Sequence, residues 1–239
     1  MVCLPELRIV VVADGIGGAS GGDVASDMAT RIISERFARQ PSILDEPRPA
    51  ERLAEVAIHE ANDAILAIAR NRKGHSGMGT TVVMGYFGRD WLLYAHVGDS
   101  RLYRLRDRVL VQLTRDHSAI QEIVDQGFFP SLDEARASGV NEHVLTRAVG
   151  SEPAVVPDTE VTDLAVGDIY LFCTDGLSGM VAHGDLFAAL DAANDGLDIA
   201  ADALVQRALE NGGLDNITLA LVRVNKVRND AKTTETRWW

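Results

Sequence analysis

The sequence is poor in cysteine, aromatic residues and positive charge. It has two cysteines, Cys3 and Cys173, and 5% of its residues are aromatic. Two cysteines without CxxC spacing exclude a disulfide framework and indicate a reducing, cytoplasmic compartment. Lysine and arginine number 23 against 35 aspartates and glutamates, which gives a formal net charge of -12. Because nucleic acids and anionic membranes attract clustered cations, we expect no nucleic-acid partner and no membrane partner.

Long hydrophobic runs are also missing. The opening residues MVCLPELRIV lack the cationic start of a signal peptide, and Pro5, Glu6 and Arg8 interrupt their apolar residues. No other stretch reaches the roughly 20 apolar residues of a membrane-spanning helix. At 46% hydrophobic, the chain can nevertheless bury a substantial core. We expect a single domain over residues 1–225, a monomer, and a poorly ordered tail over 226–239.

Helical and strand-like patterns alternate along the chain. Apolar spacing predicts helices over 24–37, 50–70, 185–193 and 198–210. Asp23 is the expected N-cap of the first helix, and the prolines from Pro41 to Pro49 predict a loop. Seven short β-rich runs predict strands over 7–13, 80–87, 91–97, 101–105, 109–113, 169–173 and 217–224.

Turn residues separate the four middle runs and predict an antiparallel meander. Residues 117–145 are more polar and weakly helical, and we interpret them as an excursion from the sheet. Helices in pairs around antiparallel strands indicate an α+β layered domain and argue against a doubly wound parallel sheet.

Three aspartates, Asp14, Asp175 and Asp215, each stand at the end of a predicted strand beside a glycine or an asparagine. A fourth, Asp99, falls in the turn Gly98-Asp99-Ser100. Carboxylate oxygens at such positions are the ligands that Mg²⁺ and Mn²⁺ prefer. Taken singly, each aspartate is better explained as a turn residue. Taken together, the pattern supports an interpretation as turns and an interpretation as a metal site about equally.

Seven segments occur in a characteristic order between Leu7 and Val224: VVADGIGGASGGDVAS, GMGTTVV, AHVGDSRLYRL, LTRDHS, VLTRAVG, DIYLFCTDGLSGMV and DNITLALV. In this order and spacing they resemble the metal-dependent protein phosphatases (PPM, type 2C), and the short loops resemble the bacterial branch of that family. The resemblance implies a four-layer α-β-β-α sandwich of two antiparallel sheets flanked by helices. It also implies that residues 117–145 form a flap-like insertion.

The resemblance further implies hydrolysis of phosphoserine and phosphothreonine on proteins, opposing a serine/threonine kinase. The implied cofactors are two Mn²⁺ or Mg²⁺ ions, bridged by a water that attacks phosphorus without a phosphoenzyme. Asp14 would bridge both ions, the Gly15 carbonyl would serve the second ion, and Asp175 and Asp215 would hold the first. Asp99 would contribute to a third, weaker site.

Other residues are assigned lesser roles on the same basis. Thr80 and Thr81 are interpreted as buried strand residues, Ser100 and Arg101 as fixing the turn around Asp99, and Asn216 as orienting Asp215. His117, in the family-like segment RDHS, is interpreted as structural. The other histidines show no metal-ligand spacing with one another and are assigned no role.

One departure from the family lies at the front of the chain. Members open with an R-x-x-N-x-D block that binds phosphate and the second ion, and the 13 residues before Asp14 contain no such block. We therefore expect that the chain begins downstream of the true start or lacks its first strand, and that its activity is reduced. The alternative is a degenerate phosphatase that binds metal or a phosphoprotein with little turnover. The retention of Asp14, Asp175 and Asp215 argues against that alternative.

Overall fold

The structure, a computed structural model, describes residues 1–17, 19–40, 46–71, 77–193 and 196–227. Most of the expected tail, and part of the expected proline loop, therefore lie outside the described residues. Within the described part of the chain, no helix combines the length and apolar character needed to cross a membrane.

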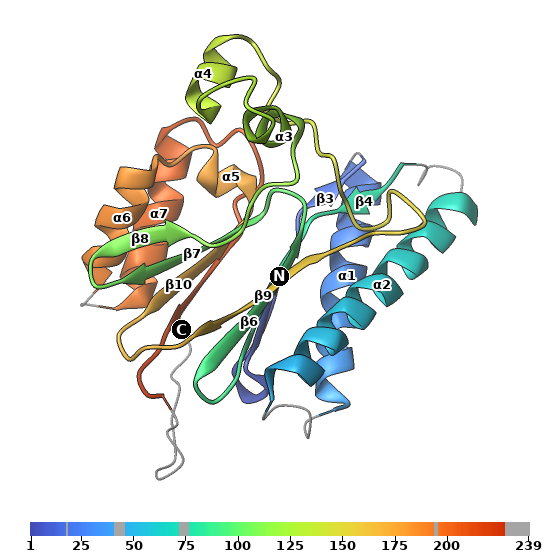
Figure 1. Cartoon of the computed structure of the whole chain (residues 1–239), viewed down its shortest axis with the longest axis horizontal. Helices are drawn as coiled ribbons and strands as arrows, with labels where there is room; N and C mark the ends of the chain where they lie inside the picture. The colour runs from blue at the N-terminus through green and yellow to red at the C-terminus, as the bar shows by residue number, and fades with distance from the viewer. Residues whose placement is uncertain (18, 41–45, 72–76, 194–195, 228–239) are drawn as a thin grey trace.

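Two antiparallel sheets form the centre of the molecule (Figure 1). The first has the order β1 (Val2–Leu4), β2 (Ile9–Val12), β5 (Val82–Phe87), β6 (Trp91–Val97) and β9 (Asp158–Asp163). The second has the order β11 (Leu219–Arg223), β10 (Ile169–Cys173), β7 (Arg101–Arg106) and β8 (Val109–Gln112). A short ladder pairs β3 (Gly15–Ile16) with β4 (Gly79–Thr80).

Long helices cover the outer faces of both sheets. The five-stranded sheet carries α1 (Ala19–Ala38) and α2 (Pro47–Asn71), and the four-stranded sheet carries α6 (His183–Asp191) and α7 (Leu197–Glu210). Figure 1 shows the resulting order of helices, sheet, sheet and helices. The expected α-β-β-α sandwich is therefore confirmed.

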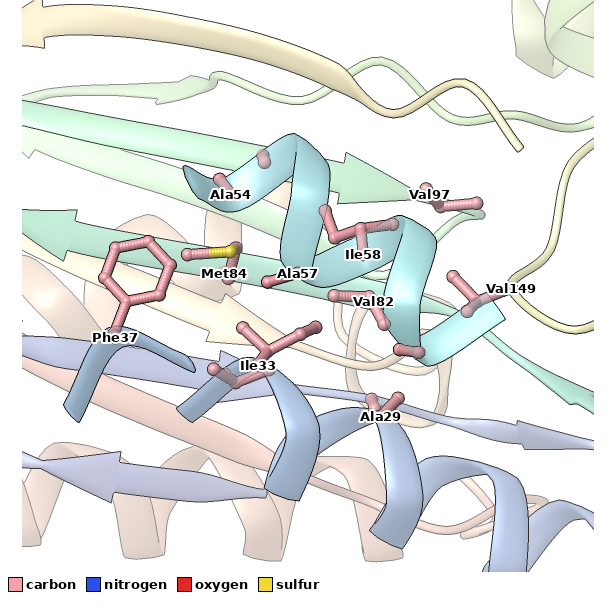
Figure 2. Packing of buried hydrophobic residues seen from close by; sticks show 14 of the residues in the cluster. Ala29, Ile33, Phe37, Ala54, Ala57, Ile58, Val82, Met84, Val97 and Val149 are labelled. Carbon is pink, nitrogen blue, oxygen red and sulfur yellow. The ribbon is translucent and has the colours of Figure 1, made fainter. Parts of the chain in front are cut away.

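The alternation of side chains along β2 divides the core into layers. Ile9 and Val11 point toward the helices. There they belong to a buried cluster in which α1 and α2 pack against the sheet, and Figure 2 shows part of this cluster. Val10 and Val12 point the other way, into an apolar layer shared with Tyr170 and other residues of the second sheet. Successive side chains of a strand face opposite sides, so a strand that is apolar at every position is covered on both faces. Figure 2 shows Ile33 and Phe37 of α1 lying against Met84 of β5.

The predicted meander is wrong at its centre. β5 and β6 form a hairpin, but β6 and β7 belong to different sheets. The Gly98-Asp99-Ser100 segment is therefore a crossover between sheets and not a hairpin turn. Sequence spacing cannot distinguish the two, because the same turn residues serve a tight hairpin and a sharp change of sheet.

Two predicted helix starts are also wrong. α1 begins at Ala19, four residues before the expected cap Asp23, and α2 begins at Pro47, inside the expected loop. Pro47 and Pro49 are compatible with the first turn of α2. The backbone N–H groups of a first turn have no acceptor within the helix, so a proline there loses no hydrogen bond.

Strand β9 and the short helix α5 (Asp175–Ser178) were not predicted. β9 reads DTEVTD and its side chains are exposed or half-buried along an edge of the sheet, so it has no apolar signal. The excursion after β8 holds α3 (Ala119–Asp125) and α4 (Leu132–Ala137), which Figure 1 places above the sandwich. The one remaining element of the described chain is a short 3-10 helix over Pro5–Leu7, between β1 and β2.

Candidate metal centre

Asp14 lies between β2 and β3 and is held through its backbone. Its N–H donates to Thr81 Oγ1 at 3.0 Å, and its carbonyl accepts from Thr80 Oγ1 at 2.7 Å and Thr81 N at 2.8 Å. Thr81 Oγ1 also shares a 2.6 Å hydrogen bond with Ser100 Oγ. Both threonines are at most 2% exposed, as expected, but Thr80 alone lies in a strand, because Thr81 falls between β4 and β5. They lock the end of β2 to the crossover that carries Asp99.

Replacing Thr81 with valine tests this lock. Thr81→Val keeps the shape but leaves the Asp14 N–H and the Ser100 hydroxyl without their partner, and an unsatisfied buried polar group costs about 1–3 kcal/mol. We expect a lower melting temperature and weaker Mn²⁺ binding, measured by calorimetry. Thr81→Ser retains the hydroxyl and should remain near wild type. Equal losses in both variants would show that packing, and not the hydrogen bond, matters.

Asp175 and Asp215 come from the opposite sheet. Asp175 opens α5 directly after β10, and Asp215 lies in the loop before β11. A side chain on Gly176 would place its Cβ 2.3 Å from the Asn216 carbonyl oxygen, so only glycine permits this close approach of the two segments. The Asp215 carboxylate accepts from the Asn216 backbone N–H at 2.7 Å. Asn216 thus contacts Asp215 as expected, but through its main chain.

The structure brings Asp14, Asp175 and Asp215 together. One carboxylate oxygen of each lies within 4.8 Å of the others. Burial and the neighbouring carboxylates Asp175, Asp215 and Asp99 raise the pKa of Asp14 to about 7. Three converging carboxylates repel one another unless protons or cations compensate them.

The donor set fits hard divalent cations. Asp175 Oδ1 is buried and has no hydrogen-bond partner among the described residues. Buried carboxylate oxygens are normally paired, so an unpartnered one on an aspartate of this cluster has the chemistry of a ligand position. Oxygen-only donors suit Mg²⁺ and Mn²⁺ better than softer metals.

Asp99 and Gly15 adjoin this cluster. Burial and the charge of Asp175 raise the pKa of Asp99 to about 7. Arg101 fixes the crossover after Asp99 by an ion pair with Asp116 at 2.6 Å. At Gly15, an added Cβ would lie 2.2 Å from the backbone of Gly22, so α1 packs directly against the backbone of β3. The position directly after Asp14 therefore has no room for a side chain.

Sequence reasoning missed a second group of titratable residues. His96 of β6, His117 and Asp158 place ligand atoms within 4.8 Å of one another, and the two imidazole rings stack at 4.6 Å. The histidines lie far apart in the sequence, and only the crossover between the sheets brings them together. Their position within AHVGDS and LTRDHS was the available signal.

The hydrogen bonds favour a structural role for this group. The Gly98 N–H donates to His117 Nδ1 at 3.2 Å, so Nε2 carries the proton and donates to Asp158 at 3.2 Å. The Arg147 guanidinium binds the same carboxylate at 2.7 Å and supplies the positive charge there. Burial lowers the pKa of both imidazoles, which keeps them neutral. His117 also donates its backbone N–H to the Gly98 carbonyl at 3.0 Å, so it binds both backbone groups of Gly98 at the start of the crossover.

A cavity of about 690 Å³ lies beside β3. Its lining includes Ile16, Arg147 and Ser151, and continues over the segment between α4 and β9. Ile16 lies two residues after Asp14 in the chain, and this residue connects the lining of the cavity to the segment that carries the carboxylate cluster. Its size suits a short stretch of peptide.

Comparisons with known proteins agree with this arrangement. The family model described as Protein phosphatase 2C matches residues 2–210. The serine/threonine phosphatase stp of Listeria innocua is 37% identical over 217 residues, which cover 91% of this chain and 84% of that protein.

Two solved structures are similar throughout. The S. agalactiae serine/threonine phosphatase has a TM-score of 0.83 and 32% identity, covering 89% of this chain and 86% of that one. The catalytic domain of the phosphatase PstP in complex with two manganese ions has a TM-score of 0.77 and 32% identity, covering 90% and 86%.

The two-sheet sandwich with a carboxylate cluster at the edge between its sheets is the architecture of a metal-dependent hydrolase. The chain belongs to the protein phosphatase 2C family. It is accordingly a protein serine/threonine phosphatase that depends on divalent metal.

Proposed function

We propose that Asp14, Asp175 and Asp215 are the metal ligands with which this chain hydrolyses phosphoserine and phosphothreonine on proteins. The observation that supports this assignment best is the convergence of the three carboxylates, one oxygen of each within 4.8 Å of the others, and Asp175 Oδ1 is in addition buried without a partner among the described residues. Asp14 would be a ligand of both ions, the Gly15 carbonyl a ligand of the second, and Asp175 and Asp215 ligands of the first. Asp99 would contribute to a third, weaker site.

When bound, Mn²⁺ or Mg²⁺ ions supply a water of lowered pKa and offset the charge of the phosphate. The residues of the chain hold the three aspartates in position. Thr80 and Thr81 fix the backbone of Asp14, and Gly176 lets the two aspartate-bearing segments of the second sheet approach. The cavity beside Ile16 accepts the peptide around the phosphorylated residue.

The proposal extends to the organisation and setting of the protein. Residues 1–225 form one phosphatase domain, and residues 117–145, with α3 and α4, are a flap beside the cleft. The chain acts as a monomer on phosphoproteins, in opposition to a serine/threonine kinase, with no nucleic-acid or membrane partner. A cytoplasmic location is consistent with its two unpaired cysteines, Cys3 and Cys173.

Phosphate release from a phosphothreonine peptide tests the function. We expect hydrolysis with Mn²⁺ or Mg²⁺, none after chelation, and recovery when metal is restored. Metal binding without turnover would instead support the degenerate phosphatase. Hydrolysis that survives chelation would contradict the metal-dependent mechanism.

The affinity for Mn²⁺ should depend on pH. Because the pKa of Asp14 is raised to about 7, the metal-free site holds a proton below that pH, and the proton competes with the ion. Displacing one proton of pKa near 7 weakens Mn²⁺ binding by about tenfold between pH 8 and pH 6. Titration calorimetry at both pH values measures this. A constant affinity would show that Asp14 is already ionised in the metal-free protein.

A further inference from the structure

The far end of the α1–α2 pair holds a second cavity, with a volume of about 600 Å³. Three arginines line it: Arg36 from α1, and Arg48 and Arg52 from α2. The chain as a whole has a net charge of -12, so a group of three guanidinium groups is a local exception. Nothing in the phosphatase mechanism uses it.

These cations are poorly compensated. Arg48 and Arg52 are exposed, and no ion pair or side-chain hydrogen bond of either is found in the described part of the chain. Arg36 binds Glu60 at 3.5 Å, but its Nε is buried without a partner among the described residues. Among the described residues that line the cavity, Glu46 is the acidic one.

The positions of Arg48 and Arg52 are unfavourable for the helix itself. They stand four residues apart on α2, where like charges repel. Arg48 also lies in the first turn of α2, where the helix dipole disfavours cations. An anion bound between them would relieve both effects, and the N-terminus of α2 would attract it further.

The floor of the cavity is apolar. Pro49 and Leu53 lie between the arginines, and Val56 beside them is 43% exposed. A fitting ligand therefore combines negative charge with an apolar group. An acidic peptide segment that contains one aliphatic side chain has this chemistry.

We propose that this cavity is a docking site for an acidic segment of the phosphoprotein substrate, and the proposal rests on the phosphatase function above. Gly22, which contacts Gly15, lies 14 residues before Arg36 on α1, or about 21 Å at the helical rise of 1.5 Å per residue. An extended linker of about seven residues spans that distance. A substrate with an acidic segment this far from its phosphorylated residue reaches both sites at once. Docking then raises the effective concentration of the phosphate at the metal centre.

Charge reversal tests the docking site directly. The probe is a fluorescent peptide that carries an eight-residue spacer and the segment Asp-Asp-Leu-Asp-Asp, without phosphate. We expect the double variant Arg48→Glu/Arg52→Glu to bind it about tenfold more weakly, the effect of losing two exposed ion pairs and gaining repulsion. The variant should instead bind the matching Lys-Lys-Leu-Lys-Lys peptide. The control Arg31→Glu/Arg207→Glu makes the same change of net charge at two half-exposed arginines outside the cavity.

Equal weakening in the variant and the control would overturn the proposal, because net charge alone would then explain binding. So would failure of the wild-type protein to bind the acidic peptide. Measurements of turnover separate the docking proposal from the proposed phosphatase function. With a phosphothreonine added before the spacer, the cavity variant should lose about tenfold in kcat/KM and keep wild-type kcat/KM on a short peptide that lacks the acidic segment. Absence of turnover in the wild-type protein would contradict the phosphatase assignment, while the binding measurement would still decide the docking site.

Discussion

Asp14→Asn and Asp175→Asn should each reduce Mn²⁺-dependent hydrolysis of a phosphothreonine peptide by about a thousandfold. The two side chains converge with Asp215 from opposite sheets, and each substitution replaces a charged oxygen ligand with a weaker neutral amide. A bound metal ion contributes several kcal/mol of charge stabilisation in the transition state, and about 4 kcal/mol corresponds to a factor of about a thousand in rate. Initial rates at saturating Mn²⁺, together with Mn²⁺ affinity from calorimetry, measure the effect.

The Asp14→Asn variant should not lose stability when the metal is absent. Burial and the nearby carboxylates raise the pKa of Asp14 to about 7, so its charge opposes folding of the metal-free protein above that pH. The neutral amide has no charge to repel, and we expect an equal or higher melting temperature at pH 8. Asp63→Asn, at an exposed position of α2, makes the same chemical change away from the site and should keep full activity. Retained activity in Asp14→Asn or Asp175→Asn would remove that residue from the proposed ligand set.

Arg106→Ala should destabilise the whole fold by about 3–5 kcal/mol, the usual cost of leaving a buried charge unpaired. Arg106 ends β7 and binds Asp168 at 2.7 Å and Asp163 at 2.7 Å. Asp168 is 1% exposed and lies just before β10, whereas Asp163 ends β9 in the other sheet. One guanidinium therefore ties the two sheets together and compensates a buried carboxylate. Urea denaturation at pH 7 measures the loss.

Arg108→Ala provides the matched control for this prediction. Arg108 lies in the β7–β8 turn, two residues after Arg106. It pairs with Asp191 at 2.9 Å, but its side chain is 76% exposed. Exposed ion pairs contribute about 0–1 kcal/mol, so this variant should unfold close to wild type. A similar small loss in Arg106→Ala would mean that water or another residue replaces the guanidinium at Asp168.

Much of the fold was predictable because the local pattern and the tertiary environment agree. β6 and β10 appear at the predicted bounds, since each is a mainly apolar run that is buried at every position. α1, α2, α6 and α7 were predicted from apolar spacing, with errors confined to their ends. β9 could not be predicted in this way, because an exposed edge strand needs hydrogen bonds to β6 but no apolar side chains.

The site was predictable in part. Three aspartates at strand ends, in an ordered set of motifs, identified Asp14, Asp175 and Asp215 as one group. Sequence could not show that β6 and β7 enter different sheets, which makes the segment around Asp99 a bridge between the two halves of the site. For the same reason it did not relate His96 to His117, which meet only through this crossover.

The sequence by itself determined the helices and central strands, the residues of the carboxylate group and the family. Periodic burial and short motifs are local properties that the chain carries before it folds. The tertiary structure alone decided which strands share a sheet, that Asp175 Oδ1 is left without a partner among the described residues, and that Arg36 joins Arg48 and Arg52 at one cavity. These features depend on packing between distant segments, since the charge and contacts of a side chain are set by neighbours that only folding brings close.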